Sequence, residues 1–252
     1  METLLDHPLA FFVLSLLVLW LSVQVGAFIR KRRLLPEDER DDFALVVNAS
    51  LTLLALIIGF TFSMAVSRYD QRKNLEEQEA NAIGTEYLRV DMLPPADAAK
   101  IRSLLRLYLD KRIQYYAASD QESITASNAA TFQLQNQLWA TVVAPVKAQP
   151  TPLTALVVAG MNDVLNAQGY AQAARWNRIP AAAWILLITI SVFCNLLIGY
   201  GVRLKSELLF LILPVVLSVS LFLIADIDSP SRGVIHVRSE NLETLAESLR
   251  SQ

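Results

Sequence analysis

The stretch ALIIGFTFSMAVSRYDQRKNLEEQEANAIGTEYLR, residues 55–89, decides the fold. It begins as an apolar run typical of membrane helices and continues into a heavily charged helical pattern. It contains no proline, and its only glycines are Gly59 and Gly84. Because no residue within it forces a helix to stop, we predict one long helix that begins in lipid and ends in water.

Composition places the chain among membrane proteins. Its 252 residues are 54% hydrophobic and 18% charged, with a mean hydropathy of +0.38, whereas soluble domains carry about 25% charged residues. Its uncharged stretches are about as long as the roughly 20 residues that a helix needs to cross a bilayer core. We therefore predict four transmembrane helices. They are Leu9–Ile29, Phe43–Ser67, Pro180–Val202 and Leu208–Ala225.

Several functional classes are disfavoured. The net charge of −2 gives no bulk basic character for nucleic acid. Because Cys194 is the only cysteine, no disulfide can form within the chain. With only two histidines besides, we expect no structural zinc site. No phosphate-binding loop or nucleophile motif is seen, so we expect no enzyme, no cofactor and no metal. Glu2 and Asp6 precede the first apolar stretch, which we take as a retained span rather than a signal peptide.

Residues 68–179 are polar and helical in pattern. Pro94-Pro95 ends the long helix, and apolar residues at helical spacing predict further helices around residues 101–116, 132–142 and 153–165. Ser119 and Asp120 are plausible caps between the first two of these. The predicted fold is all-α. Its parts are residues 1–67 with two spans, a helical extramembrane domain at 68–179, two further spans at 180–228, and a C-terminal tail at 229–252.

Positive charge does not decide the orientation in the membrane, because each side carries seven basic residues near the spans. One side has Arg30, Lys31, Arg32, Arg33, Arg40, Arg203 and Lys205. The other has Arg68, Arg72, Lys73, Arg175, Arg178, Arg232 and Arg238. The first helix usually weighs most, and its charges favour an outside N-terminus.

One face of the second span is polar and built from small residues. At about 100° per residue, the stripe comprises Asn48, Thr52, Ala55, Gly59 and Ser63, and Asp70, Glu77, Asn81 and Gly84 continue it beyond the membrane. Such a stripe faces another helix or water. Packing through small residues and hydroxyl hydrogen bonds is one alternative. The other is a pore wall with a hydrophobic constriction, which demands a homo-oligomer because one helix cannot enclose a pore.

Residues 57–73, IIGFTFSMAVSRYDQRK, resemble the second transmembrane helix of the bestrophin anion channels. Gly59-Phe60, Ser63 and Arg68-Tyr69 occupy the corresponding places. The chain is more similar still to the bacterial bestrophin-like family, long carried as a domain of unknown function. That resemblance rests on GFTFSMAVSRYDQRKNLEEQEANAIGTEYLR (59–89), RWNRIP (175–180) and ADIDSPSRGVI (225–235).

The resemblance implies a homopentamer in the bacterial inner membrane, with the second helices around a central neck and the domain at 68–179 in the cytoplasm. Neck residues carried over position by position fall on Phe60, Leu56 and Thr52. Thr52 departs from the usual bulky aliphatic residue. Ser63 follows one turn after Phe60, where the span nears a water-filled vestibule.

The resemblance weakens beyond the membrane. Tyr69-Asp70 stands where bestrophins tend to carry paired tryptophans. Glu76, Glu77 and Glu79 follow, and an acidic vestibule would disfavour anions. These acids form either a solvated face, salt bridges between subunits, or an attractor for cations. We assign Asp70, Glu77 and Asn81 to the vestibule and leave the ion open, anion by resemblance and cation by charge.

Other charged residues also have two interpretations. Asp226 and Asp228 could bind a cation, or they cap a helix end and pair with a base such as Arg178 or Arg232. Arg68 and Arg72 are interpreted as interfacial anchors that meet lipid phosphates.

The sequence thus predicts a homo-oligomeric ion channel whose partners are the lipid bilayer and inorganic ions, with a pore lined by Thr52, Leu56, Phe60 and Ser63. The alternative is a non-conducting scaffold or sensor whose helical domain binds a partner. A carrier is disfavoured because inverted repeats and broken spans are not seen.

Overall fold

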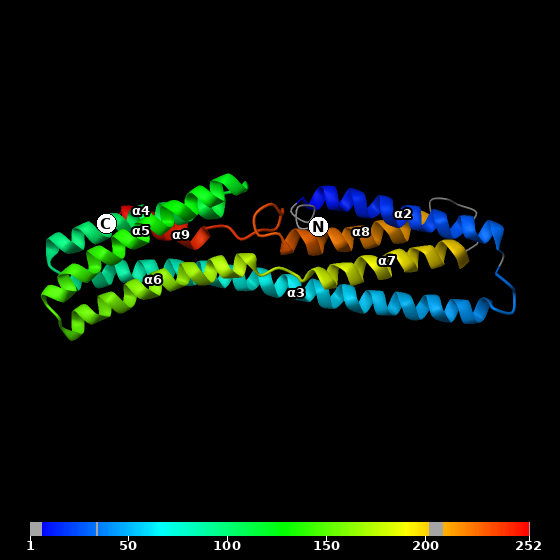
Figure 1. The fold of residues 1–252 in the computed structure, drawn as a ribbon, viewed down its shortest axis with the longest axis horizontal. Coiled ribbons are helices and arrows are strands. Elements are labelled where there is room, and N and C mark those ends of the chain that lie inside the picture. Colours follow the sequence, from blue (N-terminus) through cyan, green and yellow to red (C-terminus); the bar gives the residue numbers. More distant parts are fainter. Residues whose placement is uncertain (1–6, 34, 202–208, 252) are drawn as a thin grey trace. The chain divides into compact units, whose positions relative to one another are not determined.

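The computed structural model describes residues 7–33, 35–201 and 209–251, and all regular structure within these ranges is helical (Figure 1). The elements are α2 (Pro8–Arg32), α3 (Arg40–Arg89), η1 (Val90–Met92), α4 (Pro95–Ala117), α5 (Gln121–Ala148), α6 (Pro152–Trp176), α7 (Ala181–Gly201), α8 (Leu209–Asp228) and α9 (Glu240–Arg250). The chain divides into two compact units, Met1–Arg68 with Arg178–His236 and Tyr69–Asn177 with Val237–Gln252. The predicted all-α class is confirmed.

The described residues include four helical stretches that are long and apolar enough to cross a membrane. They lie in α2, the first part of α3, α7 and α8, as the hydropathy predicts. The proposed start of the fourth span at Leu208, the basic residues Arg203 and Lys205, and the acids Glu2 and Asp6 lie outside the described residues.

Helix α3 is the predicted long helix, with 50 residues and no interruption. Asp41 and Asp42 occupy its first turn, where acidic side chains stabilise the positive end of the helix dipole. The α-helix ends at Arg89 and tightens into the single turn η1, before Pro94 sets an extended backbone. The same uninterrupted helix therefore contributes residues to both units.

The first unit is held by close backbone packing of α2 on α7. A Cβ atom on Gly26 would lie 2.1 Å from the carbonyl oxygen of Leu196, and one on Gly199 would lie 2.0 Å from that of Val23. Glycines at these positions let the two backbones touch, as small residues do in membrane helix pairs. Phe11 also stacks edge-to-face on Trp184 with ring centroids 5.5 Å apart. Helix α8 packs on α2 as well.

The second unit has an apolar core built by α3, α4, α5, α6 and α9. Asp120 caps α5 by accepting a hydrogen bond from the Ser123 N–H at 2.8 Å, as its place in the sequence predicts. Thr151 and Thr154 form a reciprocal capping box at the start of α6. Residues 240–250, which the sequence analysis places in the C-terminal tail, form α9 and add Leu242 to this core.

Glycine packing of α2 on α7 can be tested with a matched pair of variants. Gly199→Ala should lower the melting temperature in mild detergent, because the added methyl group meets the Val23 carbonyl; overpacking of this kind typically costs about 1–3 kcal/mol. Gly169→Ala is the control, since a Cβ atom there has nothing within 4 Å. It should be neutral or stabilise α6 by up to about 1 kcal/mol. Equal melting temperatures for the two variants would contradict this packing.

Candidate functional site

The proposed pore residues all lie on α3 with their side chains exposed. Thr52, Leu56, Phe60 and Ser63 belong to the apolar part of the helix. Leu56 is 52% exposed and Phe60 is 65% exposed, so neither side chain is covered by the rest of the described chain. A Cβ atom added at Gly59 would meet open space. This face of the span is therefore available to lipid, water or another chain.

The proposed vestibule residues continue the same face beyond the membrane. Asp70, Glu77 and Asn81 are exposed, and with the four pore residues they define what we call the open face of α3. A buried stripe runs along the opposite side of the helix. Each of its residues follows an open-face residue by two positions, which corresponds to a rotation of about 200° around the helix axis. The pairs are Thr52 with Leu54, Ser63 with Ala65, Asp70 with Arg72, Glu77 with Glu79, and Asn81 with Ile83.

Within the predicted second span, residues 43–67, the buried side chains are Leu54, Thr61 and Ala65. The hydroxyl groups of Thr52 and Thr61 donate to the carbonyl oxygens of Asn48 and Ile57, each at 2.8 Å. Thr52 therefore satisfies its hydroxyl hydrogen within its own helix. It presents a weakly polar, uncharged surface to whatever covers the open face.

Of the three acids Glu76, Glu77 and Glu79, the first and the last are buried. Their burial corrects the interpretation of these two as a solvated face or as salt bridges between subunits. Glu79 is fully buried and forms an ion pair with Arg112, and it accepts a hydrogen bond from the Tyr116 hydroxyl at 3.2 Å. Burial alone would lower the pKa of Arg112, but the facing Glu79 carboxylate outweighs burial and raises that pKa. The guanidinium of Arg112 also lies 4.3 Å from the centre of the Tyr115 ring.

Glu76 fixes the beginning of α9. Its carboxylate accepts the backbone N–H groups of Asn241 at 3.1 Å and Leu242 at 3.0 Å, and the side-chain amide of Asn241 at 2.6 Å. Burial raises the pKa of Glu76, and these hydrogen bonds oppose that rise. Of the three acids, Glu77 is the exposed one. The positions 72, 76, 79 and 83 share one side of α3 at helical spacing, and this signal could have identified the buried acids.

One of the two arginines predicted to contact lipid phosphates, Arg72, lies in the protein interior, which corrects that prediction for this residue. Arg72 is only 6% exposed, so it is part of the protein interior rather than a contact for lipid phosphates. Arg68 is half-buried, and its Nη2 atom lies 3.8 Å from the sulfur of Met64.

Asp226 and Asp228 serve as structural acceptors. Asp226 accepts the backbone N–H groups of Val234 and Ile235, each at 2.8 Å, and so closes the loop after α8. Asp228 accepts the N–H of Ile179 at 3.1 Å and lies 3.6 Å from the guanidinium of Arg178. The part of the chain that the structure describes holds no group of three or more potential metal ligands.

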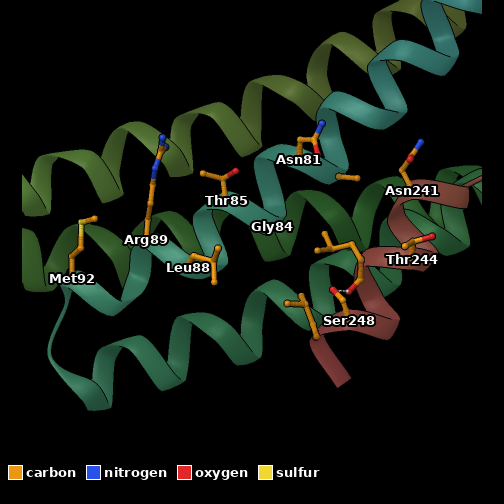
Figure 2. Close-up of a pocket in the computed structure, with 12 residues that line it drawn as sticks. Asn81, Gly84, Thr85, Leu88, Arg89, Met92, Asn241, Thr244 and Ser248 are labelled. Carbon is orange, nitrogen blue, oxygen red and sulfur yellow. Dashed lines mark hydrogen bonds between the residues drawn. The ribbon is translucent and has the colours of Figure 1, made fainter. Parts of the chain in front are cut away.

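Figure 2 shows a groove between α3 and α9 that the sequence analysis did not identify. Its volume is about 630 Å³. Asn81 of the open face lines it, with Thr85 and Leu88 from the same helix, and Thr244 and Ser248 from α9. The groove was not predicted because the sequence of residues 229–252 has no pattern that indicates packing against α3.

A family model described as a Bestrophin-like domain matches residues 9–242. A crystal structure of a bacterial bestrophin homolog from Klebsiella pneumoniae, solved by zinc phasing, covers 96% of this chain and 96% of its own, with a TM-score of 0.67 and 15% identity. A variant of that homolog gives a TM-score of 0.68 at 15% identity, covering 95% and 98% of the two chains. At this identity the structures show a shared fold. No curated relative matches the chain in sequence.

The buried ion pair can be tested against its exposed neighbour. Glu79→Gln should destabilise the protein by about 3–5 kcal/mol, because it leaves the Arg112 charge buried without compensation. Glu77→Gln, a matched change two residues earlier on the opposite side of α3, should stay within about 0.5 kcal/mol. Denaturant or thermal unfolding in detergent measures both. A Glu79 variant as stable as the Glu77 variant would show that the pair does not hold α3 against α4.

Proposed function

Because the chain belongs to the bestrophin-like domain family, we propose that it assembles as a homo-oligomeric ion channel whose pore is lined by the open face of α3. One observation carries the proposal. The open face runs from Thr52 to Asn81 without burial within the protomer, while the opposite side of the same helix packs inside it.

The physical argument concerns the part of that face inside the bilayer. Thr52, Gly59 and Ser63 are small or polar, and such residues in a span typically face other helices or a water-filled cavity. A closed ring of identical chains gives each copy of α3 the same surroundings and can enclose water at the centre. The family resemblance favours five subunits, and we propose a pentamer in the bacterial inner membrane.

Phe60 is the proposed constriction. A ring of exposed phenyl groups would surround a narrow apolar passage, and such passages gate by dewetting. Leu56 and Thr52 continue the passage by one helical turn each. Ser63 lies one turn beyond Phe60 in the other direction, toward the charged half of the helix, where the passage would widen into the vestibule.

The charge of the proposed vestibule affects whether the channel selects anions or cations. Because Glu76 and Glu79 are buried, the open face carries the carboxylates of Asp70 and Glu77 alone. Two carboxylates in each subunit, repeated around a ring, still attract cations, whereas the bestrophin resemblance favours anions. Reversal potentials under a salt gradient separate these two selectivities once a current is recorded.

The pore assignment can be tested with two phenylalanines at nearly the same depth. Phe60→Ala should raise the conductance of the purified protein in planar bilayers, because it removes the apolar barrier to wetting. Phe62→Ala is the matched control. Phe62 is 40% exposed but lies about 200° around the helix from Phe60, so its loss should leave conductance unchanged.

Either of two results would count against the proposal that the open face lines a channel. Protein that stays electrically silent across salts, pH and voltage, with both variants equally silent, would favour the non-conducting scaffold or sensor. Equal changes in conductance from Phe60→Ala and Phe62→Ala would keep a channel but remove the open face as its lining.

We further propose that residues 68–179 lie in the cytoplasm. Single cysteines at Glu37 and Glu122, both exposed positions, can report this in a Cys194→Ser background. An impermeant thiol reagent added to spheroplasts should label position 37, between the first two spans, and spare position 122 in α5. Labelling of position 122 with protection of position 37 would reverse the orientation.

A further inference from the structure

Glu86 is a buried acid that neither lines the proposed pore nor belongs to the apolar core. Its side chain is fully buried in the second unit, and neither carboxylate oxygen has a hydrogen-bond partner among the described residues. An ionised carboxylate in that setting is costly, because burial removes its hydration and no hydrogen bond from the described residues replaces it. Glu79, two turns earlier on α3, is equally buried but has Arg112 and Tyr116 as partners.

The backbone of α6 is shaped to receive this carboxyl group. A Cβ atom added to Gly160 would lie 2.0 Å from Oε2 of Glu86 and 2.6 Å from Nη1 of Arg89. Any side chain larger than that of glycine would therefore displace Glu86 or Arg89. The carboxyl group thus lies directly against the backbone of α6.

The charged groups that face Glu86 are Arg89 from its own helix and Asp163 from α6. The Arg89 guanidinium lies 3.7 Å from the carboxylate of Asp163. With Glu86 protonated, the cluster holds one positive and one negative charge and is balanced. With Glu86 ionised, two carboxylates share one guanidinium between the same two helices.

From this geometry we propose that the Glu86 carboxyl group is a proton-binding site that couples the packing of α3 on α6 to pH. In the protonated state the group is neutral and fits the buried contact over Gly160. Loss of the proton places an ion there, which either draws Arg89 away from Asp163 or loosens the contact between the helices.

The titration range follows from burial. Burial raises the pKa of Glu86 from its ordinary 4.5 to about 8, with Asp163 adding to the rise and Arg89 opposing it. Between these two values the folded protein holds a proton that the unfolded chain has released. Stability from this site is therefore fully present below about pH 4.5 and is lost progressively as the pH rises to about 8.

The site lies on the helix that carries the open face, but the inference does not rest on conduction. It concerns the packing of two helices within one unit. It can therefore hold or fail whether or not the protein passes ions, and its test uses no measurement of current.

Melting temperature as a function of pH tests the proposal on the full-length protein in mild detergent. Wild type should lose stability between about pH 4.5 and about pH 8. Glu86→Gln, which keeps the shape of the neutral acid, should lose less, so the difference between the two should grow with pH. Glu77→Gln, which removes an exposed acid from the same helix, should follow the wild-type profile.

Infrared spectroscopy supplies a direct readout that does not depend on the stability of any one variant. At neutral pH, wild type and Glu77→Gln should show the carbonyl stretch of a buried protonated carboxylic acid, and Glu86→Gln should lack it. Asp163→Asn should shift the loss of that band to lower pH, because it removes a like charge and frees Arg89 for Glu86. Identical melting profiles for wild type and Glu86→Gln would overturn the proposal. So would a wild-type protein without the band at neutral pH.

Discussion

The structure depends on one constraint on α3. This single unbroken helix must place apolar side chains in lipid along its first part and polar side chains in water along its second part. Its backbone is hydrogen-bonded internally along its whole length, as a span requires. One stripe of its side chains is buried, and the open face lies about 200° around the helix axis from that stripe. The buried stripe anchors the helix inside the protomer. The open face is what the protomer leaves for its surroundings, and in the membrane its small and polar residues are poorly matched to lipid.

The buried stripe changes chemistry where the helix leaves the membrane. Inside the span it is made of Leu54, Thr61 and Ala65. Beyond the span, charged residues such as Glu76 and Glu79 join apolar residues such as Ile83. Glu79 holds α4 through Arg112, and Glu76 holds the beginning of α9. A buried ion pair that loses one partner is strongly destabilising. These contacts therefore fix the rotation of α3 about its own axis, and with it the direction in which Asp70 and Glu77 point.

Much of this fold could be predicted from the sequence, because membrane insertion leaves a strong signal in hydropathy. The four apolar helices, the uninterrupted α3 and the Asp120 cap all follow from local patterns. The burial of Glu76 and Glu79 was not predicted, because a run of charged residues is normally solvated. The helical spacing of positions 72, 76, 79 and 83 indicates that they share one side of α3, and the partners Arg112 and Asn241 show that this side is buried. Helix α9 was missed because its apolar set is short, with Leu242, Ala246 and Leu249 spread among acidic residues. The α3–α9 groove was missed for the same reason.

The open face is the central claim, and a cryo-electron microscopy map of the protein in lipid nanodiscs tests it most directly. The account predicts a closed ring in which every copy of α3 turns Thr52, Phe60 and Ser63 toward a continuous axial cavity, narrowest at the phenyl rings. A monomer would contradict it. A ring in which these three residues contact lipid or pack dry against a neighbouring helix, with no axial cavity, would contradict it equally.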